Sequence, residues 1–240
     1  MTWSIVAREA RSGAFGVAVA SRFFAVGALC PHAESGTGAL STQALLDPRY
    51  GRRGLALLRE GLPAPEVVQR LVTADEGRAH RQVHAVDAAG RTGQHTGAAC
   101  IGWCGALAGE GYSVAGNMLA GARVIEDTAA AFEAGGALAF AERLIAALAA
   151  GEAAGGDKRG KQSAALLVYS GEEYPELSLR VDDAAEPLAE LARLAAKAHE
   201  RFVPFTRCLP SRARPAGVLD RDAIEAEVAR YQAARAGRRA

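Results

Sequence analysis

The chain has 240 residues, of which 50% are hydrophobic and 23% charged, so it has enough apolar residues for the core of a layered single domain. Its formal net charge of +1 excludes a general electrostatic attraction to nucleic acid or to membrane surfaces. No segment reaches the ~18 apolar residues of a membrane span, and Arg8 and Glu9 interrupt the first apolar run, so we expect neither an anchor nor a signal peptide and place the protein in the cytoplasm.

The N-terminal part of the sequence indicates β-structure. Thr2–Arg8 and Ala14–Ser21 are predicted strands, because small and β-branched residues run up to a connection that ends in glycine. Ala25–Cys30 and Gly38–Thr42 are two further short strands, and Pro31–Gly36 is the predicted connection between them.

The apolar period then changes to that of helices. Tyr50–Glu60 and Ala64–Ala74 carry apolar residues at helical spacing. Gln82–Val86 and Arg91–Thr96 return to a strand pattern around a turn signal. The glycine-rich segment Ile101–Val114 is expected to contain a strand and a loop.

The second half repeats this order of helices followed by strands. Val124–Glu133 and Ala137–Ala150 are predicted alanine-rich helices, and Ser163–Tyr169 and Leu177–Val181 are predicted strands. Glu186–Arg201 has the leucine spacing of an amphipathic helix. Blocks of strands and helices of this kind are typical of an α+β fold with antiparallel sheets and segregated helices.

The pattern weakens after residue 203. Pro204, Pro210 and Pro215 interrupt the chain, and Leu219–Ala236 reads as an appended helix. We therefore expect a main domain over residues 1–203 and a Pro/Arg-rich extension over residues 204–240. A helix of this length is marginal by itself, so it should dock on its own chain or on a neighbouring subunit.

Thr2 has a special chemical position in the sequence. Methionine aminopeptidase removes Met before small residues, so the mature chain could begin at Thr2 and carry a hydroxyl and a free α-amine on one residue. An α-amine titrates near neutrality and can act as the base for its own hydroxyl. The competing interpretation is an ordinary first strand with a polar starting residue.

The loop over residues 155–163 differs by one residue from the consensus G-x-x-x-x-G-K-[ST] of a phosphate-binding loop. Such a loop needs a strand before it and a helix after it, whereas here the predicted order is reversed. One alternative is a flexible polar connector. The other is a site loop that carries Asp157, Arg159 and Gln162 towards the Thr2 end of the sheet, where Asp157 and Arg159 fix each other and Gln162 points into the same pocket.

Asn117 is a candidate donor to a developing oxyanion, because it lies between a glycine and an apolar pair just before a predicted helix. An asparagine in a turn is the competing interpretation. The four cysteines and five histidines show no spacing that matches a metal site. We therefore expect no metal and no cofactor.

Several segments together resemble one bacterial and archaeal family, which is catalogued as domain of unknown function 1028. The resemblance runs from Thr2 to about Ala195. The matching segments are Thr2-Trp3-Ser4-Ile5-Val6-Ala7-Arg8, Gly16-Val17-Ala18-Val19, Ser21-Arg22-Phe23, Ala25-Val26-Gly27, Thr42-Gln43-Ala44, Tyr50-Gly51, Arg81-Gln82, Thr96-Gly97, Gly116-Asn117-Met118-Leu119 and Gly155-Gly156-Asp157-Lys158-Arg159-Gly160-Lys161-Gln162-Ser163-Ala164.

The resemblance implies a four-layer αββα sandwich of the N-terminal-nucleophile (Ntn) hydrolase type, a group that cleaves amide bonds. Carried over by position, Thr2 is the nucleophile with its own amine as the base, and Asn117 is the oxyanion donor. Ser21 and Arg22 fall where such hydrolases keep polar groups that support the nucleophile. Some relatives carry a C-terminal peptidoglycan-binding module, which implies cell-wall amides as substrates.

We therefore expect a hydrolase of a small polar amide, with Thr2, Asn117 and Ser21 as its catalytic residues. The candidate substrate-binding residues are Arg22, Gln43, Asp157, Arg159 and Gln162. Arginine guanidinium groups suit a substrate carboxylate. The alternative is a non-catalytic binding or assembly protein that keeps the sandwich. In either case a homodimer is expected, because closed two-fold dimers are the commonest oligomers.

Overall fold

The computed structural model describes residues 2–237, so the expected removal of Met1 concerns a residue outside the described part. The chain divides into two compact units that meet between Leu191 and Ala192. The expected domain boundary after residue 203 stays a prediction.

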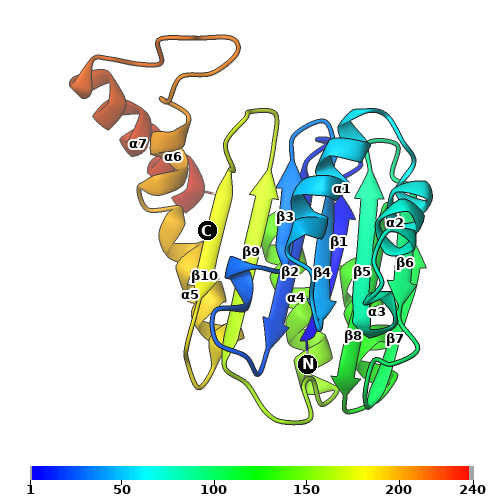
Figure 1. Ribbon diagram of the computed structural model, residues 1–240. Helices are drawn as coiled ribbons and strands as arrows, with labels where there is room; N and C mark the ends of the chain where they lie inside the picture. The colour runs from blue at the N-terminus through cyan, green and yellow to red at the C-terminus, as the bar shows by residue number, and fades with distance from the viewer. Residues whose placement is uncertain (1, 238–240) are drawn as a thin grey trace. The chain divides into compact units, whose positions relative to one another are not determined.

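The larger of two sheets in the first unit has six strands in the order β10-β9-β2-β1-β8-β7, with antiparallel neighbours throughout (Figure 1). Its strands are β1 (Thr2–Arg8), β2 (Phe15–Ser21), β7 (Trp103–Gly109), β8 (Tyr112–Leu119), β9 (Ser163–Tyr169) and β10 (Leu177–Val181). The predicted bounds of β1, β9 and β10 are confirmed, because each of these strands carries its apolar pattern over its whole length.

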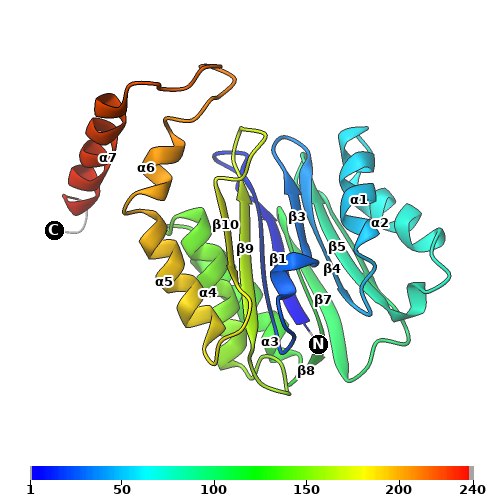
Figure 2. The ribbon, with the colours of Figure 1, turned by 60° about the vertical axis from the view of Figure 1, so that its left-hand side comes forward.

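The second sheet has four antiparallel strands in the order β3-β4-β5-β6. Its strands are β3 (Pro31–Glu34), β4 (Gly38–Ala44), β5 (Arg81–Asp87) and β6 (Thr92–Thr96). The two sheets stack face to face, with β1 against β4 and β8 against β5 (Figure 2).

Helices cover the outer face of each sheet and complete an αββα sandwich (Figure 2). On the four-stranded sheet lie α1 (Arg49–Arg59) and α2 (Ala64–Thr73), and on the six-stranded sheet lie α3 (Arg123–Ala134) and α4 (Phe140–Ala153). The expected fold class is confirmed: the described chain is an α+β protein with two stacked antiparallel sheets.

Small residues allow the helices to approach the six-stranded sheet closely. A Cβ placed on Gly16 of β2 would lie 2.5 Å from Leu144 Cδ1 of α4. A Cβ placed on Gly151 of α4 would lie 2.9 Å from the indole nitrogen of Trp3. Glycine at these two positions makes room for the side chains opposite, so the helix can pack closely against the sheet.

Two predicted elements near the start of the chain are wrong. Ala25–Cys30 is not a strand, because Ala25 has φ 54° and Val26–Ala28 forms a 3-10 turn. The backbone N–H groups of Ala25 and Val26 donate to the Asp182 carbonyl and the Ser163 hydroxyl, so distant segments take the bonds a ladder would have used. Pro31, expected in a connection, instead begins edge strand β3, a position that proline tolerates.

The second unit consists of helices. They are the greater part of α5 (Pro187–Ala198), together with α6 (Phe202–Thr206) and α7 (Arg221–Ala236). The Asp220 side chain caps α7 by accepting from the backbone N–H groups of Asp222 and Ala223. Tyr231 of α7 stacks on His199, so the expected appended helix exists and docks within its own unit.

Candidate functional site

Three of the predicted catalytic residues meet at one end of the six-stranded sheet. Thr2 begins β1 and is paired with Asn117 near the end of β8. Ser21 ends β2, the other neighbour of β1 in the sheet. The antiparallel pairing therefore places side chains that are up to 115 residues apart in the sequence beside each other.

The hydroxyl of Thr2 lies in a buried polar environment. Thr2 Oγ1 is 3.1 Å from Ser21 Oγ, and the Thr2 carbonyl accepts a hydrogen bond from Asn117 Nδ2 at 3.4 Å. Thr2 is 6% exposed, and Ser21 and Asn117 are each 2% exposed. The geometry brings a nucleophile candidate, a second hydroxyl and an amide donor together.

Asn117 lies inside β8 and not in the expected turn before a helix. Its amide also donates to Gln82 Oε1 at 3.0 Å, so both of its N–H groups have acceptors inside the protein. The bond to Thr2 is the longer of the two. An oxyanion acceptor would therefore replace the bond to Thr2 with the smallest loss of hydrogen-bond energy.

Gln43 belongs to a polar network between the two sheets. Its amide donates to Gln82 Oε1 at 2.8 Å and to the Ala115 carbonyl at 3.1 Å, and its own Oε1 accepts from Ser4 at 2.7 Å. Gln43 is fully buried. Since each polar atom has a partner in the protein, this geometry supports a role in joining the sheets and does not support substrate contact.

His84 is a member of the same network that sequence reasoning missed. Its ring nitrogens lie 2.8 Å from Ser4 Oγ and 2.9 Å from Ser113 Oγ, and the ring is fully buried. Burial lowers the pKa of His84 to about 3, so the imidazole is neutral at physiological pH. The signal in the sequence was the position of His84 two residues after Gln82, which places both polar side chains on one face of a strand.

The predicted site loop is tied to the Thr2 end of the sheet by Asp157. Its carboxylate accepts from the backbone N–H of Arg22 at 2.8 Å and from the backbone N–H of Arg159 at 2.8 Å. The Arg159 guanidinium pairs with the same carboxylate at 3.2 Å. The expectation that Asp157 and Arg159 fix each other at this end of the sheet is confirmed.

The remaining two candidates, Arg22 and Gln162, have separate hydrogen-bond partners. The Arg22 guanidinium donates to the Lys161 carbonyl at 3.2 Å and lies at the surface beside the loop. The Gln162 side chain donates to Asp183 at 3.1 Å in an exposed contact. The expectation that Gln162 points into a shared pocket is wrong, because its hydrogen-bond partner Asp183 lies in the connection between β10 and α5.

Backbone strain concentrates at the same end of the sandwich. In the described part of the chain, the non-glycine residues with positive φ are Ala25 (54°), Ala44 (68°) and Met118 (54°). Ala25 follows β2, Ala44 ends β4, and Met118 lies next to the end of β8. Strain of this kind persists only where the surroundings hold it, and it gathers at functional sites.

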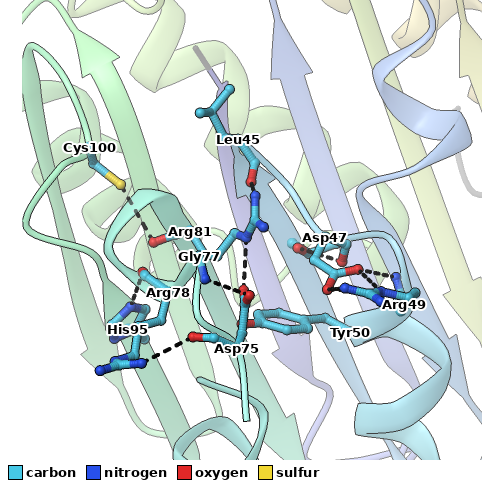
Figure 3. A network of polar contacts seen from close by, with 11 residues as sticks. Leu45, Asp47, Arg49, Tyr50, Asp75, Gly77, Arg78, Arg81, His95 and Cys100 are labelled. Carbon is cyan, nitrogen blue, oxygen red and sulfur yellow. Dashed lines mark hydrogen bonds and ion pairs between the residues drawn. The ribbon is translucent and has the colours of Figure 1, made fainter. Parts of the chain in front are cut away.

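A second polar cluster holds the loop after β4 at this end (Figure 3). Asp75 accepts from Arg81 at 2.9 Å and from Tyr50 at 2.8 Å, and Arg81 also donates to the carbonyl of Leu45. The Arg81 guanidinium is the main cause that lowers the pKa of Asp75 to about 2. The cluster therefore fixes the residue that follows the strained Ala44.

Within residues 2–237, no group of three or more His, Cys, Asp or Glu side chains is arranged to hold a metal ion. None of the helices described is long and apolar enough to cross a membrane.

Comparison with known proteins relates the chain to one protein family. The model of a family of unknown function, DUF1028, matches residues 2–191 and ends at the same residue as the first compact unit. The crystal structure of protein SPO2555 from Silicibacter pomeroyi, assigned to the same family model, is 31% identical with a TM-score of 0.85. The similarity covers 91% of this chain and 99% of that chain. No curated protein matches the sequence. The chain therefore belongs to the DUF1028 family.

Proposed function

We propose that the protein is an amidohydrolase of the Ntn type that cleaves the C–N bond of a small polar amide. Thr2 is the nucleophile after removal of Met1, and its own α-amine is the base. We further propose that it acts in the cytoplasm as a homodimer. The observation that carries the proposal is the position of the Thr2 hydroxyl, 3.1 Å from Ser21 and on the strand beside Asn117.

The neighbours of Thr2 favour its own amine as the base. Ser21 presents a hydroxyl, which has no basic group, and His84 bonds to Ser4 and Ser113 in the network between the sheets. A free α-amine on Thr2 titrates near neutrality and is attached to the same Cα as the nucleophile. The amine takes the hydroxyl proton, and Thr2 Oγ1 attacks the amide carbon. The ammonium then gives this proton to the leaving nitrogen as the C–N bond breaks, and water hydrolyses the acyl-threonine ester to release the acid and free Thr2.

Two arginines favour a substrate that carries a negative charge. The Arg22 side chain is exposed at the Thr2 end of the sheet. The Arg159 side chain is 39% exposed on the loop that Asp157 ties to this end. Guanidinium groups bind carboxylates with paired hydrogen bonds. A polar amide that carries a carboxylate, including one released from the cell wall, fits these two guanidinium groups.

The test combines N-terminal sequencing with an amide panel. Protein that begins at Thr2 should hydrolyse a member of the panel, and Thr2→Ala should lower kcat by at least about 10³-fold. Thr2→Ser should retain part of the activity. Thr73→Ala, an exposed threonine on α2, is the matched control and should not change the rate. Active protein that still carries Met1 would exclude the free-amine mechanism.

A non-catalytic binding or assembly role is the second candidate. Asn117 uses both amide N–H groups inside the protein, and Thr2 is nearly buried, which is also the arrangement of a structural polar cluster. This role is favoured if protein that begins at Thr2 turns over no amide, ureide or peptide, while Thr2→Ala lowers only the free energy of unfolding.

A further inference from the structure

Gln82 is a fully buried side chain on β5 that joins both sheets and that the proposed mechanism does not use. Its Oε1 atom accepts from Gln43 Nε2 at 2.8 Å and from Asn117 Nδ2 at 3.0 Å. Its Nε2 atom donates to the Gly116 carbonyl at 2.8 Å and to the Thr96 hydroxyl at 2.9 Å. The amide therefore uses both acceptor positions and both N–H groups inside the protein.

Backbone carbonyls fix which end of the Gln82 amide faces which partner. A carbonyl oxygen can only accept, so the Gly116 carbonyl requires the nitrogen of Gln82 on its side. Gly105 presents a second carbonyl to this nitrogen at 3.2 Å. If the amide were turned over, its oxygen would face two carbonyl oxygens, and no hydrogen would lie between them. The oxygen of Gln82 therefore faces Asn117.

The orientation of Gln82 in turn determines that of the Asn117 amide. Gln82 Oε1 can only accept, so Asn117 must present its NH₂ group to it. The same nitrogen also donates to the Thr2 carbonyl at 3.4 Å. If the Asn117 amide were turned over, its oxygen would meet two acceptors, Gln82 Oε1 and the Thr2 carbonyl. The Gly116 carbonyl thus determines, through Gln82, that an N–H donor lies beside Thr2.

We propose that Gln82 is the positioning residue that holds the Asn117 amide with its nitrogen towards Thr2. Without Gln82, the NH₂ group would keep only the longer bond to the Thr2 carbonyl within the described part of the chain. The amide could then rotate and present its oxygen in place of an N–H. The catalytic consequence rests on the proposed function, in which Asn117 donates to the oxyanion, whereas the orientation itself does not.

Hydrogen exchange of the Asn117 side-chain NH₂, followed by ¹H–¹⁵N NMR, tests the orientation without any turnover. Gln82→Met removes the acceptor and should raise this exchange at least about tenfold, which is the factor of one lost hydrogen bond. Gln43→Met is the matched control, because it removes an equally buried glutamine bonded to the same oxygen and leaves the bond between Gln82 and Asn117. Equal exchange in the two variants would overturn the positioning role.

A double-mutant cycle separates positioning from general damage to the fold. Gln82→Met should lower kcat about tenfold with KM within about threefold, a smaller loss than the roughly 10²–10³-fold expected for Asn117→Ala. Added to Asn117→Ala, it should lower kcat no further, because Gln82 acts through that amide. A further tenfold loss in the double variant would overturn this role, since Gln82 would then act independently of Asn117.

Neutron diffraction of the perdeuterated parent protein keeps the test decisive if Gln82→Met does not fold. Deuterons on the Asn117 atom that faces Gln82 and Thr2 would support the assignment, and deuterons on its other terminal atom would overturn it. A protein that hydrolyses no amide but shows this orientation would count against the proposed activity and leave the positioning of Asn117 in place. An active protein with the Asn117 amide turned over would do the reverse.

Discussion

Thr2 and Trp3 are consecutive residues that serve opposite faces of the six-stranded sheet. Successive side chains of a strand point to opposite faces. Thr2 lies on the same face as Ser4, which bonds to Gln43 and His84 of the second sheet, whereas Trp3 lies against Gly151 of α4. One dipeptide therefore supplies the candidate nucleophile on one face and an indole that packs against α4 on the other.

The buried His84 makes the stability of the protein depend on pH. Its folded-state pKa of about 3 lies below the ordinary value of 6.5, so the unfolded chain binds the additional proton between these values. The free energy of unfolding should therefore fall as the pH is lowered from 6.5 towards 3. Denaturant titration at several pH values measures this slope.

Substitution shows whether His84 is the source of that slope. His84→Gln should show a flatter pH dependence than the parent protein over the same range. His95→Gln, whose imidazole in the parent is bonded to the Arg78 carbonyl in an exposed contact, is the control and should leave the slope unchanged. Equal slopes for the parent protein and His84→Gln would contradict the assignment.

At the scale of elements, the Asp157 side chain ties the connection after α4 to the end of β2. Asp157 accepts from the backbone N–H groups of Arg22 and Arg159, and residue 157 also bridges Leu119 at the end of β8. Asp157→Ala should expose both N–H groups and increase their hydrogen exchange by about tenfold or more, because a charge-assisted bond is lost at each. Asp183→Ala is the control. It removes the hydrogen-bond partner of Gln162, which lies in the same loop as Asp157, and it should leave the Arg22 amide protected from exchange.

The approach of α4 to β2 depends on the absence of a side chain at Gly16. Gly16→Ala places a methyl group 2.5 Å from Leu144 and 2.9 Å from the Phe140 ring, so these buried side chains or the helix that carries them must shift. We expect a loss of about 1–3 kcal/mol in the free energy of unfolding. Gly121→Ala has no neighbour within 4 Å and should change it by less than about 0.5 kcal/mol. Similar values for both variants would show that the layers are loosely packed.

At the scale of the whole molecule, the family match and the first compact unit end at the same residue. Both stop at Leu191, so the family model covers the sandwich. The helices of the second unit pair with each other through Arg201–Glu225 and through His199–Tyr231.

The assembly state is a prediction at this scale. We expect a homodimer, because alanine-rich helices bury little area per residue and closed two-fold dimers are the commonest oligomers. Light scattering at micromolar concentration should give twice the chain mass of 24.9 kDa. A mass equal to that of one chain would contradict the expectation.

The sequence by itself determined the alternating blocks of strands and helices, the bounds of β1, β9 and β10, and the pairing of Asp157 with Arg159, because these depend on local period and on short loops. Only the tertiary structure decided what distant groups do. It placed Asn117 in a strand, gave Gln162 to Asp183, joined Gln43 and His84 between the sheets, and bent Ala25–Cys30 away from a ladder. Each of these outcomes depends on a hydrogen-bond partner far along the chain, and no local pattern encodes that partner.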